Sequence, residues 1–231
     1  MNFLKKGLSG TAIKIIALVS MTFDHFGAIL FPEIMFFRIV GRIAMPIFAY
    51  MIAEGCVYTK NKTKRFLLIF LLGLICQVVY YFTYPTWNLN ILIDFSISIL
   101  IIYSLQYATK LGKWQGWLLP LGLTLLTSFC VYELPKYVGG GTLYFDYGFF
   151  CIMSPVFVYA FKDKRLKLLV LALALLPISL YSILYIQWYS YLALIPLALY
   201  NGQRGKYKMK YFFYIYYPVH IGALYLISMI F

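Results

Sequence analysis

The sequence predicts an all-α fold, a polytopic bundle of about nine transmembrane helices, and three observations support this prediction. Hydrophobic residues make up 63% of the 231 residues and charged residues only 12%, against roughly 25% charged in soluble domains. Apolar runs close to membrane-spanning length recur along the chain. Basic clusters occupy every second connector between these runs, as topology signals do. Little length remains for a soluble domain, so residues 1–231 are expected to form a single transmembrane domain.

The apolar runs define the expected spans in chain order. They lie at about 11–31, 36–57, 66–84, 88–109, 114–132, 146–161, 166–184, 187–200 and 211–231. Basic residues precede the first run and follow the second, fourth, sixth and eighth. The positive-inside rule then places the N-terminus in the cytosol and the C-terminus outside a cell membrane. The first run lacks a small-residue cleavage site, so it is interpreted as a retained span rather than a signal peptide.

The formal net charge of +13 is explained by these topology signals and does not indicate a nucleic-acid surface. The basic clusters are suited to membrane lipids with anionic headgroups or to a phosphate-bearing ligand. The four cysteines show no C-x-x-C spacing and are expected to be free, buried thiols. Two histidines and scattered carboxylates give no recognisable metal-ligand spacing.

Ionisable residues inside the apolar runs are the main functional signal. Each charge at the centre of a membrane helix costs about 2.5–3.5 kcal/mol on insertion scales, unless partners or water receive it. A helical rise of about 1.5 Å per residue places Asp24, Arg42 and Asp94 roughly 10 Å below the outer face, and His220 near the midplane. An ion pair between Asp24 and Arg42 would offset much of the burial cost. We therefore expect a solvated polar pocket inside the bundle.

Helix geometry adds further residues to this layer. Arg38 precedes Arg42 by four positions, and Asn90 precedes Asp94 by four, so each pair is expected on one helical face. Pro46 deprives the Arg42 carbonyl of its helical donor. Pro218 does the same to the Tyr214 carbonyl, one turn below His220. Broken helices are tolerated at membrane depth where they line a cavity or pack against protein.

Several of these residues also have a purely structural interpretation. A buried Asp–Arg pair can be architectural, and a buried histidine can serve only as a hydrogen-bond donor. Glu54 can extend toward Lys60 and Lys62 at the cytosolic end of its span. Gln77 is expected to form a hydrogen bond between helices rather than a site.

Seven short motifs occur in order along nearly the whole chain. They are Asp24-His25-Phe26-Gly27, Arg38-Ile39-Val40-Gly41-Arg42 running into Pro46-Ile47-Phe48, Glu54-Gly55, Asn90-Ile91-Leu92, Asp146-Tyr147-Gly148, Tyr200-Asn201-Gly202 and Tyr217-Pro218-Val219-His220. Together they resemble the TraX family of membrane proteins. At Asp94 the sequence differs from the small hydroxyl residue of that family.

The resemblance implies N-terminal acetylation of a pilin subunit, and a distant similarity to transmembrane acyltransferases that use cytosolic acyl-CoA. The implied donor is acyl-CoA, most simply acetyl-CoA, and neither metal nor haem is expected. The implied acceptor is an amine or hydroxyl on the outer side, either a pilin-like N-terminus or a cell-envelope molecule. The basic connector with Arg204, Lys206, Lys208 and Lys210 is expected to hold the CoA phosphates.

Catalytic roles are expected for Asp24, His25, Arg42 and His220. One of the two histidines is expected to act as general base or to be transiently acylated. Asp24 would orient that imidazole, and Arg42 would stabilise the thioester oxyanion. Substrate-binding roles are expected for Arg38, Glu54, Asn90, Asp94, Asp146 and Tyr217.

Three other functions are compatible with the same residues. A proton-coupled transporter of small solutes also requires intramembrane acidic, basic and imidazole groups. A haem-binding electron carrier would use His25 and His220 as axial ligands. A purely structural subunit would have little need for so many buried charges.

Overall fold

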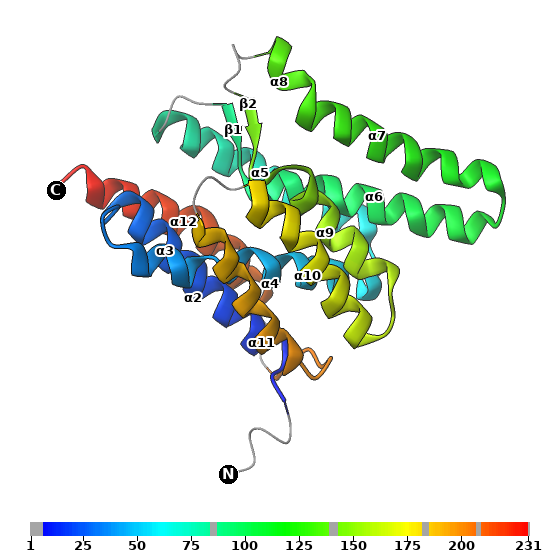
Figure 1. The fold of residues 1–231 in the computed structure, drawn as a ribbon, viewed down its shortest axis with the longest axis horizontal. Helices are drawn as coiled ribbons and strands as arrows, with labels where there is room; N and C mark the ends of the chain where they lie inside the picture. Colours follow the sequence, from blue (N-terminus) through cyan, green and yellow to red (C-terminus); the bar gives the residue numbers. More distant parts are fainter. Residues whose placement is uncertain (1–6, 84–86, 139–142, 182–184, 207–208, 231) are drawn as a thin grey trace. The chain divides into compact units, whose positions relative to one another are not determined.

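The computed structural model describes residues 7–83, 87–138, 143–181, 185–206 and 209–230. It confirms the all-α class and adds one small two-stranded sheet (Figure 1). Contacts within the chain divide it into two compact units, Met1–Met51 with Leu171–Phe231, and Ile52–Val170. The organisation of the whole chain as one functional domain stays a prediction.

The first unit contains the N-terminal and C-terminal helices. It comprises α2 (Gly10–Ile29), α3 (Met35–Gly41), the start of α4 (Ala44–Tyr58), the end of α10 (Lys164–Tyr181), the 3₁₀ segment η3 (Tyr185–Ala193), α11 (Leu194–Ala198) and α12 (Lys210–Ser228). Helix α2 packs against α3 and against α12. The ends of the chain therefore meet in one helical group, which positions side chains far apart in the sequence.

The start of α2 is anchored to the connector after α11. Ser9 is the N-cap, and its hydroxyl accepts a hydrogen bond from the amide of Ala12. The Gly10 amide donates to the Gln203 carbonyl at 2.7 Å. The hydroxyl of Thr11 donates to the Arg204 carbonyl at 2.8 Å. These bonds fix the basic connector at the beginning of α2 and satisfy helix-start donors that would otherwise be unpaired.

The second predicted span is interrupted where Pro46 indicated. Helix α3 ends at Gly41, and two residues beginning with Arg42 separate it from α4. The Ser20 hydroxyl lies 2.6 Å from the Val40 carbonyl and 3.1 Å from the Gly41 carbonyl. A side-chain donor from α2 therefore satisfies carbonyls that the break releases. This prediction is confirmed.

Two other features of the predicted spans need correction. Pro218 lies inside α12 without interrupting it, so the last span is not broken there. The eighth run is divided between η3 and the short helix α11, which contains Pro196, rather than forming one regular helix. Proline removes a helical donor in both helices, but packing decides whether the helix continues.

Five helices within the described residues are long and apolar enough to cross a membrane. They are Gly10–Ile29, Met35–Tyr58 across the break at Arg42, Lys62–Tyr81, Ile91–Leu111 and Trp114–Tyr132. Gly148–Ala160 is a shorter apolar helix. The chain is thus a multi-pass membrane protein. That it has nine spans and a cytosolic N-terminus stays a prediction.

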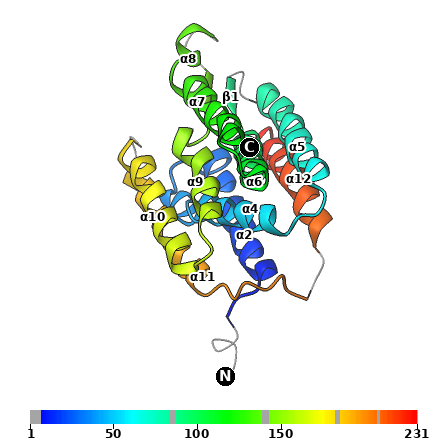
Figure 2. The same cartoon turned by 90° about the vertical axis from the view of Figure 1, so that its right-hand side faces the viewer.

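The second unit is organised around α6. It comprises the end of α4, α5 (Lys62–Thr83), β1 (Trp87–Leu89), α6 (Ile91–Leu111), the 3₁₀ turn η1 (Trp114–Trp117), α7 (Leu118–Tyr132), α8 (Leu134–Tyr137), β2 (Leu143–Phe145), α9 (Gly148–Ala160) and the start of α10. Helix α6 packs against α5, α7 and α9 (Figure 2). Strands β1 and β2 pair in parallel with Leu89 opposite Phe145. Both strands lead directly into helices, so the starts of α6 and α9 lie close together.

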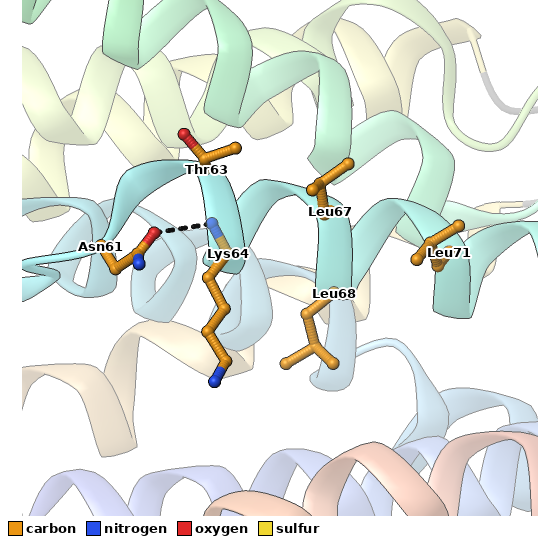
Figure 3. Close-up of a pocket in the computed structure, with 6 residues that line it drawn as sticks. All are labelled: Asn61, Thr63, Lys64, Leu67, Leu68 and Leu71. Atoms are coloured by element: carbon orange, nitrogen blue, oxygen red, sulfur yellow. Dashed lines mark hydrogen bonds between the residues drawn. The ribbon is translucent and has the colours of Figure 1, made fainter.

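The outer face of α5 is apolar and open, as expected for a lipid-facing helix. Leu71, Ile75 and Val78 are each more than half exposed, at 53%, 55% and 57%. A groove of about 450 Å³ runs along this helix (Figure 3). It is lined by Asn61, Thr63, Lys64, Leu67, Leu68 and Leu71. None of these is a predicted site residue.

Candidate functional site

The two histidines of the chain meet in the first unit. His25 on α2 and His220 on α12 are joined by a hydrogen bond of 2.8 Å between Nδ1 and Nε2, and their ring centroids lie 5.0 Å apart. His220 is buried, whereas His25 is partly exposed. An iron atom between two axial nitrogens would need a separation of about 4 Å, twice a typical metal–nitrogen bond. The contact therefore argues against shared haem ligation.

The hydrogen bonds of the pair fix its tautomers. Nδ1 of His220 lies 2.9 Å from the Tyr216 carbonyl, which can only accept, so this nitrogen carries a proton. In a neutral His220 ring, Nε2 is then the acceptor, and Nδ1 of His25 must donate to it. A neutral His25 consequently keeps its basic lone pair on Nε2. The basic nitrogen of the pair thus lies on the more exposed of the two imidazoles.

Two tyrosines hold the imidazole pair in place. The Tyr216 ring stacks on His220 at 5.1 Å, and its hydroxyl lies 2.8 Å from the Thr22 hydroxyl. The Tyr217 ring meets His25 and His220 edge-on, at 6.3 and 5.5 Å. Tyr217 was predicted, whereas Tyr216 and Thr22 were not. Tyr216 precedes His220 by four residues, and this spacing on one helical face was the available signal.

One carboxylate beside the histidines is held by two guanidinium groups. Asp24 Oδ1 lies 2.7 Å from Arg42 Nη2, and Oδ2 lies 3.1 Å from Arg38 Nη1. The expected pairing of Asp24 with Arg42 is therefore present. Two positive groups against one negative group leave this part of the site with a net charge of about +1, which favours an anion nearby.

The two arginines differ in their surroundings. Arg42 has 7% of its side chain exposed, and it also donates to the Gln187 side chain and the Arg38 carbonyl, both at 3.3 Å. Arg38 has 28% of its side chain exposed. Among the described residues, every hydrogen bond from the Arg38 side chain comes from Nη1. Arg38 is thus the more accessible cation, and Arg42 is the one built into the fold.

The role expected for Asp24 in orienting an imidazole stays a prediction. Its two oxygens are bound by Arg42 and Arg38, one each. Nδ1 of His220 is held by the Tyr216 carbonyl. Desolvated guanidinium groups attract a carboxylate strongly, which accounts for the two ion pairs. Gln187, which sequence reasoning missed, completes this network, since its amide also donates to the Ser190 hydroxyl at 2.8 Å.

Close packing at a glycine supports the carboxylate. A Cβ atom added to Gly41 would overlap the side chain of Asp24. Gly41 is also the last residue of α3, immediately before Arg42. The absence of a side chain here lets α2 and α3 approach closely enough for the ion pairs to form.

Glu54 lies in the second unit and pairs with Lys167 of α10. Both side chains are largely buried, at 8% and 13% exposed. The structural alternative, in which Glu54 extends toward Lys60 and Lys62, is therefore wrong in its partners. A buried carboxylate is stabilised best by a cation that is itself desolvated, and Lys167 meets that condition.

Asn90 caps α6 instead of lying within it. Its side chain accepts from the Leu92 amide at 3.1 Å and donates to the Gly73 carbonyl at 2.8 Å. Gln77 of α5 accepts from both the amide and the side chain of Asn90. The expected helix–helix bond of Gln77 is confirmed, but the expected common helical face of Asn90 and Asp94 is wrong. A binding role for Asn90 stays a prediction.

The remaining predicted residues are distributed between the two units. Tyr217 lies against the two histidines, while Asp94 and Asp146 belong to the second unit. Arg204 and Lys206 are exposed on the connector at the start of α2. Lys208 lies outside the described residues, and Lys210 begins α12. The histidine cluster is defined hereafter as Asp24, His25, Arg38, Arg42, Tyr216, Tyr217 and His220.

Two further observations concern metals and thiols. Within the described ranges, no group of three or more His, Cys, Asp or Glu side chains could hold a metal ion. The four cysteines, Cys56, Cys76, Cys130 and Cys151, are free. The histidine cluster presents imidazole, guanidinium, carboxylate and phenol groups.

Comparison with known proteins assigns the family. The family model described as TraX protein matches residues 9–228. The chain belongs to the TraX family. The matched region contains the whole histidine cluster.

Two relatives illustrate the range of similarity to this TraX chain. A protein of Dichelobacter nodosus named "Probable fimbrial assembly protein FimC, serogroup H1" is 22% identical over 251 aligned residues, covering 94% of each chain. The uncharacterized protein RP591 of Rickettsia prowazekii (strain Madrid E) is 36% identical over 92 residues. That match spans 39% of this chain and 35% of the Rickettsia protein. No solved structure matches the chain.

Proposed function

We propose that the chain is an integral membrane acyltransferase that moves an acetyl or other short acyl group from cytosolic acyl-CoA to an acceptor on the outer side. The observation that carries this proposal is the hydrogen-bonded pair of His25 and His220, with two guanidinium groups beside it. Acyl transfer needs a base for the attacking group and a positive group for the oxygen that becomes charged. The histidine cluster supplies both.

In the proposed step, Nε2 of His25 takes the proton from the acceptor amine or hydroxyl. The acceptor nitrogen or oxygen forms a bond to the thioester carbonyl carbon, and the carbonyl electrons move to oxygen. The carbon–sulfur bond then breaks, the carbonyl re-forms, and the proton on His25 passes to the departing CoA sulfur. His220 holds His25 in the required tautomer through the 2.8 Å hydrogen bond.

Arg38 is the better candidate for the oxyanion. Arg42 already donates to Asp24, Gln187 and the Arg38 carbonyl, so binding a substrate oxygen would require it to give up a buried partner. Arg38 is more exposed, and its ion pair with Asp24 uses Nη1. We therefore assign oxyanion stabilisation to Arg38 and a positioning role to Arg42.

The donor is proposed to lie along α2. The basic connector with Arg204 and Lys206 is hydrogen-bonded to the start of α2 at Thr11. His25 follows Thr11 by fourteen residues, which corresponds to about 20 Å along the helix. An extended pantetheine arm can span such a distance. CoA phosphates at the connector are thus compatible with a thioester at His25.

The acceptor is proposed to be a protein amine, such as a pilin-like N-terminus, in preference to a cell-envelope hydroxyl. The Dichelobacter nodosus relative is named a probable fimbrial assembly protein, and this name supports an acceptor of that class. The similarity extends over 94% of both chains, so it covers nearly their whole length rather than one segment.

Release of CoA thiol by the purified protein tests this proposal. The protein in detergent or nanodiscs is incubated with acetyl-CoA and a panel of peptides with free N-termini, simple amines and alcohols. We expect acceptor-dependent thiol release that Arg38→Ala reduces strongly and that Lys64→Gln, in the α5 groove, leaves unchanged. Solute flux without CoA dependence, together with no thiol release for any acceptor, would contradict the proposal.

A proton-coupled transporter is the second candidate, and one observation favours it. Asp94 is a fully buried carboxyl group in the second unit, and such groups occur in proton relays. The histidine cluster would then move protons instead of activating a nucleophile. Proton-driven solute uptake into proteoliposomes distinguishes this function from acyl transfer.

A further inference from the structure

Asp94 is the least solvated carboxyl group of the second unit. It lies in the first turn of α6 and is 0% exposed. In the described part of the chain, neither of its carboxylate oxygens has a hydrogen-bond partner. A buried carboxylate without a donor is among the most costly groups a protein can contain. Its chemical state therefore needs an explanation that the proposed acyl transfer does not provide.

The donors around Asp94 are already used. The first-turn amide of Leu92 donates to the Asn90 side chain, which caps the helix in place of Asp94. The Ser96 hydroxyl donates to the Leu92 carbonyl. The Ser98 hydroxyl lies 2.7 Å from the Ile152 carbonyl and 3.0 Å from the backbone carbonyl of Asp94. These nearby donors thus bind other oxygens and leave the Asp94 carboxyl group without a donor.

The strand pair places one other acidic residue near the start of α6. The register that sets Leu89 opposite Phe145 brings the ends of both strands together, and Asp146 is the first residue after β2. Asp146 is exposed, in contrast to the fully buried Asp94. No salt bridge among the described residues involves Asp94.

We propose that Asp94 is a proton-binding site, held as a neutral carboxylic acid. A charged carboxylate at this fully buried position would lose its hydration without gaining a hydrogen-bond donor in return. The proposal is independent of the acyl transfer assigned to the histidine cluster. It also replaces the sequence-based expectation that Asp94 binds substrate directly.

Infrared spectroscopy of the purified protein in nanodiscs tests this proposal, because a protonated carboxyl group has a carbonyl stretch distinct from that of a carboxylate. At neutral pH we expect a protonated-carboxyl band in the wild type. Aspartate labelled with carbon-13 at the side-chain carboxyl should shift this band. Asp94→Asn should remove it, and Asp146→Asn, which removes an exposed carboxyl group, should leave it in place.

The matched control is Glu54→Gln, which removes a carboxylate of the same unit that is also buried but is paired with Lys167. We expect this variant to keep the band. A wild-type spectrum without any label-sensitive band, or a band that persists in a folded Asp94→Asn protein, would overturn the proposal. The labelled wild type gives a result even where a variant does not fold.

Discussion

Nδ1 of His25 lies 2.8 Å from Nε2 of His220, although 195 residues separate the two in the sequence. The bond joins the first and last helices of the first unit. The Tyr216 carbonyl fixes the proton of His220 on Nδ1, and a neutral imidazole carries only one ring N–H. Nε2 of His220 must therefore accept, which fixes the proton of His25 on its Nδ1. The basic nitrogen of the pair is consequently Nε2 of His25.

Replacing His220 by alanine is expected to abolish acyl transfer while the protein remains inserted and folded. The substitution removes the acceptor for Nδ1 of His25, so both the ring orientation and its tautomer are lost. We expect transfer from labelled acetyl-CoA to fall by about 10²–10⁴-fold, the usual contribution of a positioned general base. Tyr216→Phe is the control, because it keeps the ring stack and the backbone carbonyl. A fully active His220→Ala protein would eliminate the mechanism.

Loss of Arg42 is expected to affect mainly stability, and loss of Arg38 mainly acyl transfer. Arg42→Ala leaves Asp24 partly unpaired in a buried site, so the free energy of unfolding should fall by about 3–5 kcal/mol. Arg38→Ala removes the more exposed partner and should reduce stability less while reducing thiol release more. Thermal unfolding in detergent and thiol release per folded molecule measure the two effects. Equal stability losses for both variants would contradict the assignment.

Gly41→Ala is expected to disrupt the ion pairs without changing any charge. The added methyl group overlaps the Asp24 side chain, so that side chain or α3 must move. We expect lower stability and reduced acyl transfer. Gly222→Ala is the matched control, because a Cβ atom on this glycine of α12 has no described atom within 4 Å. Indistinguishable unfolding temperatures for the two variants would show that the close approach is unimportant.

Asn90→Ala is expected to destabilise the start of α6. The asparagine caps the helix and bonds to Gln77 and the Gly73 carbonyl, so loss of the cap alone should cost about 0.5–2 kcal/mol. Asn90→Ser retains a capping oxygen and should recover part of the loss. Chemical denaturation of both variants measures the difference. Equal free energies of unfolding for the wild type and Asn90→Ala would be inconsistent with the capping role.

The sequence could predict the residues of the site that violate the hydropathy pattern. Asp24, Arg42 and His220 are unusual inside apolar runs, and an opposite pair such as Asp24 and Arg42 has few other ways to offset its burial. Pro46 likewise located the break in the second span, because a missing amide has a fixed consequence four residues earlier. These predictions depend on local chemistry alone.

The rest of the site depends on tertiary packing. Glu54 and Lys167 are 113 positions apart, and several nearer lysines were equally plausible partners by sequence. Gln187 and Tyr216 belong to residue types common in membrane helices, so composition did not single them out. Asn90 lies at the cap because α6 begins only at Ile91, directly after β1, and hydropathy does not fix a helix boundary to the exact residue.

A comparison of acyl transfer by the wild type and by His25→Ala tests most directly whether His25 is the general base. Purified wild type and His25→Ala, matched by unfolding temperature, are incubated with labelled acetyl-CoA and an acceptor that the wild type uses. The histidine-pair mechanism predicts label on the acceptor in the wild type and background label in the variant. Equal labelling by the two proteins would contradict it.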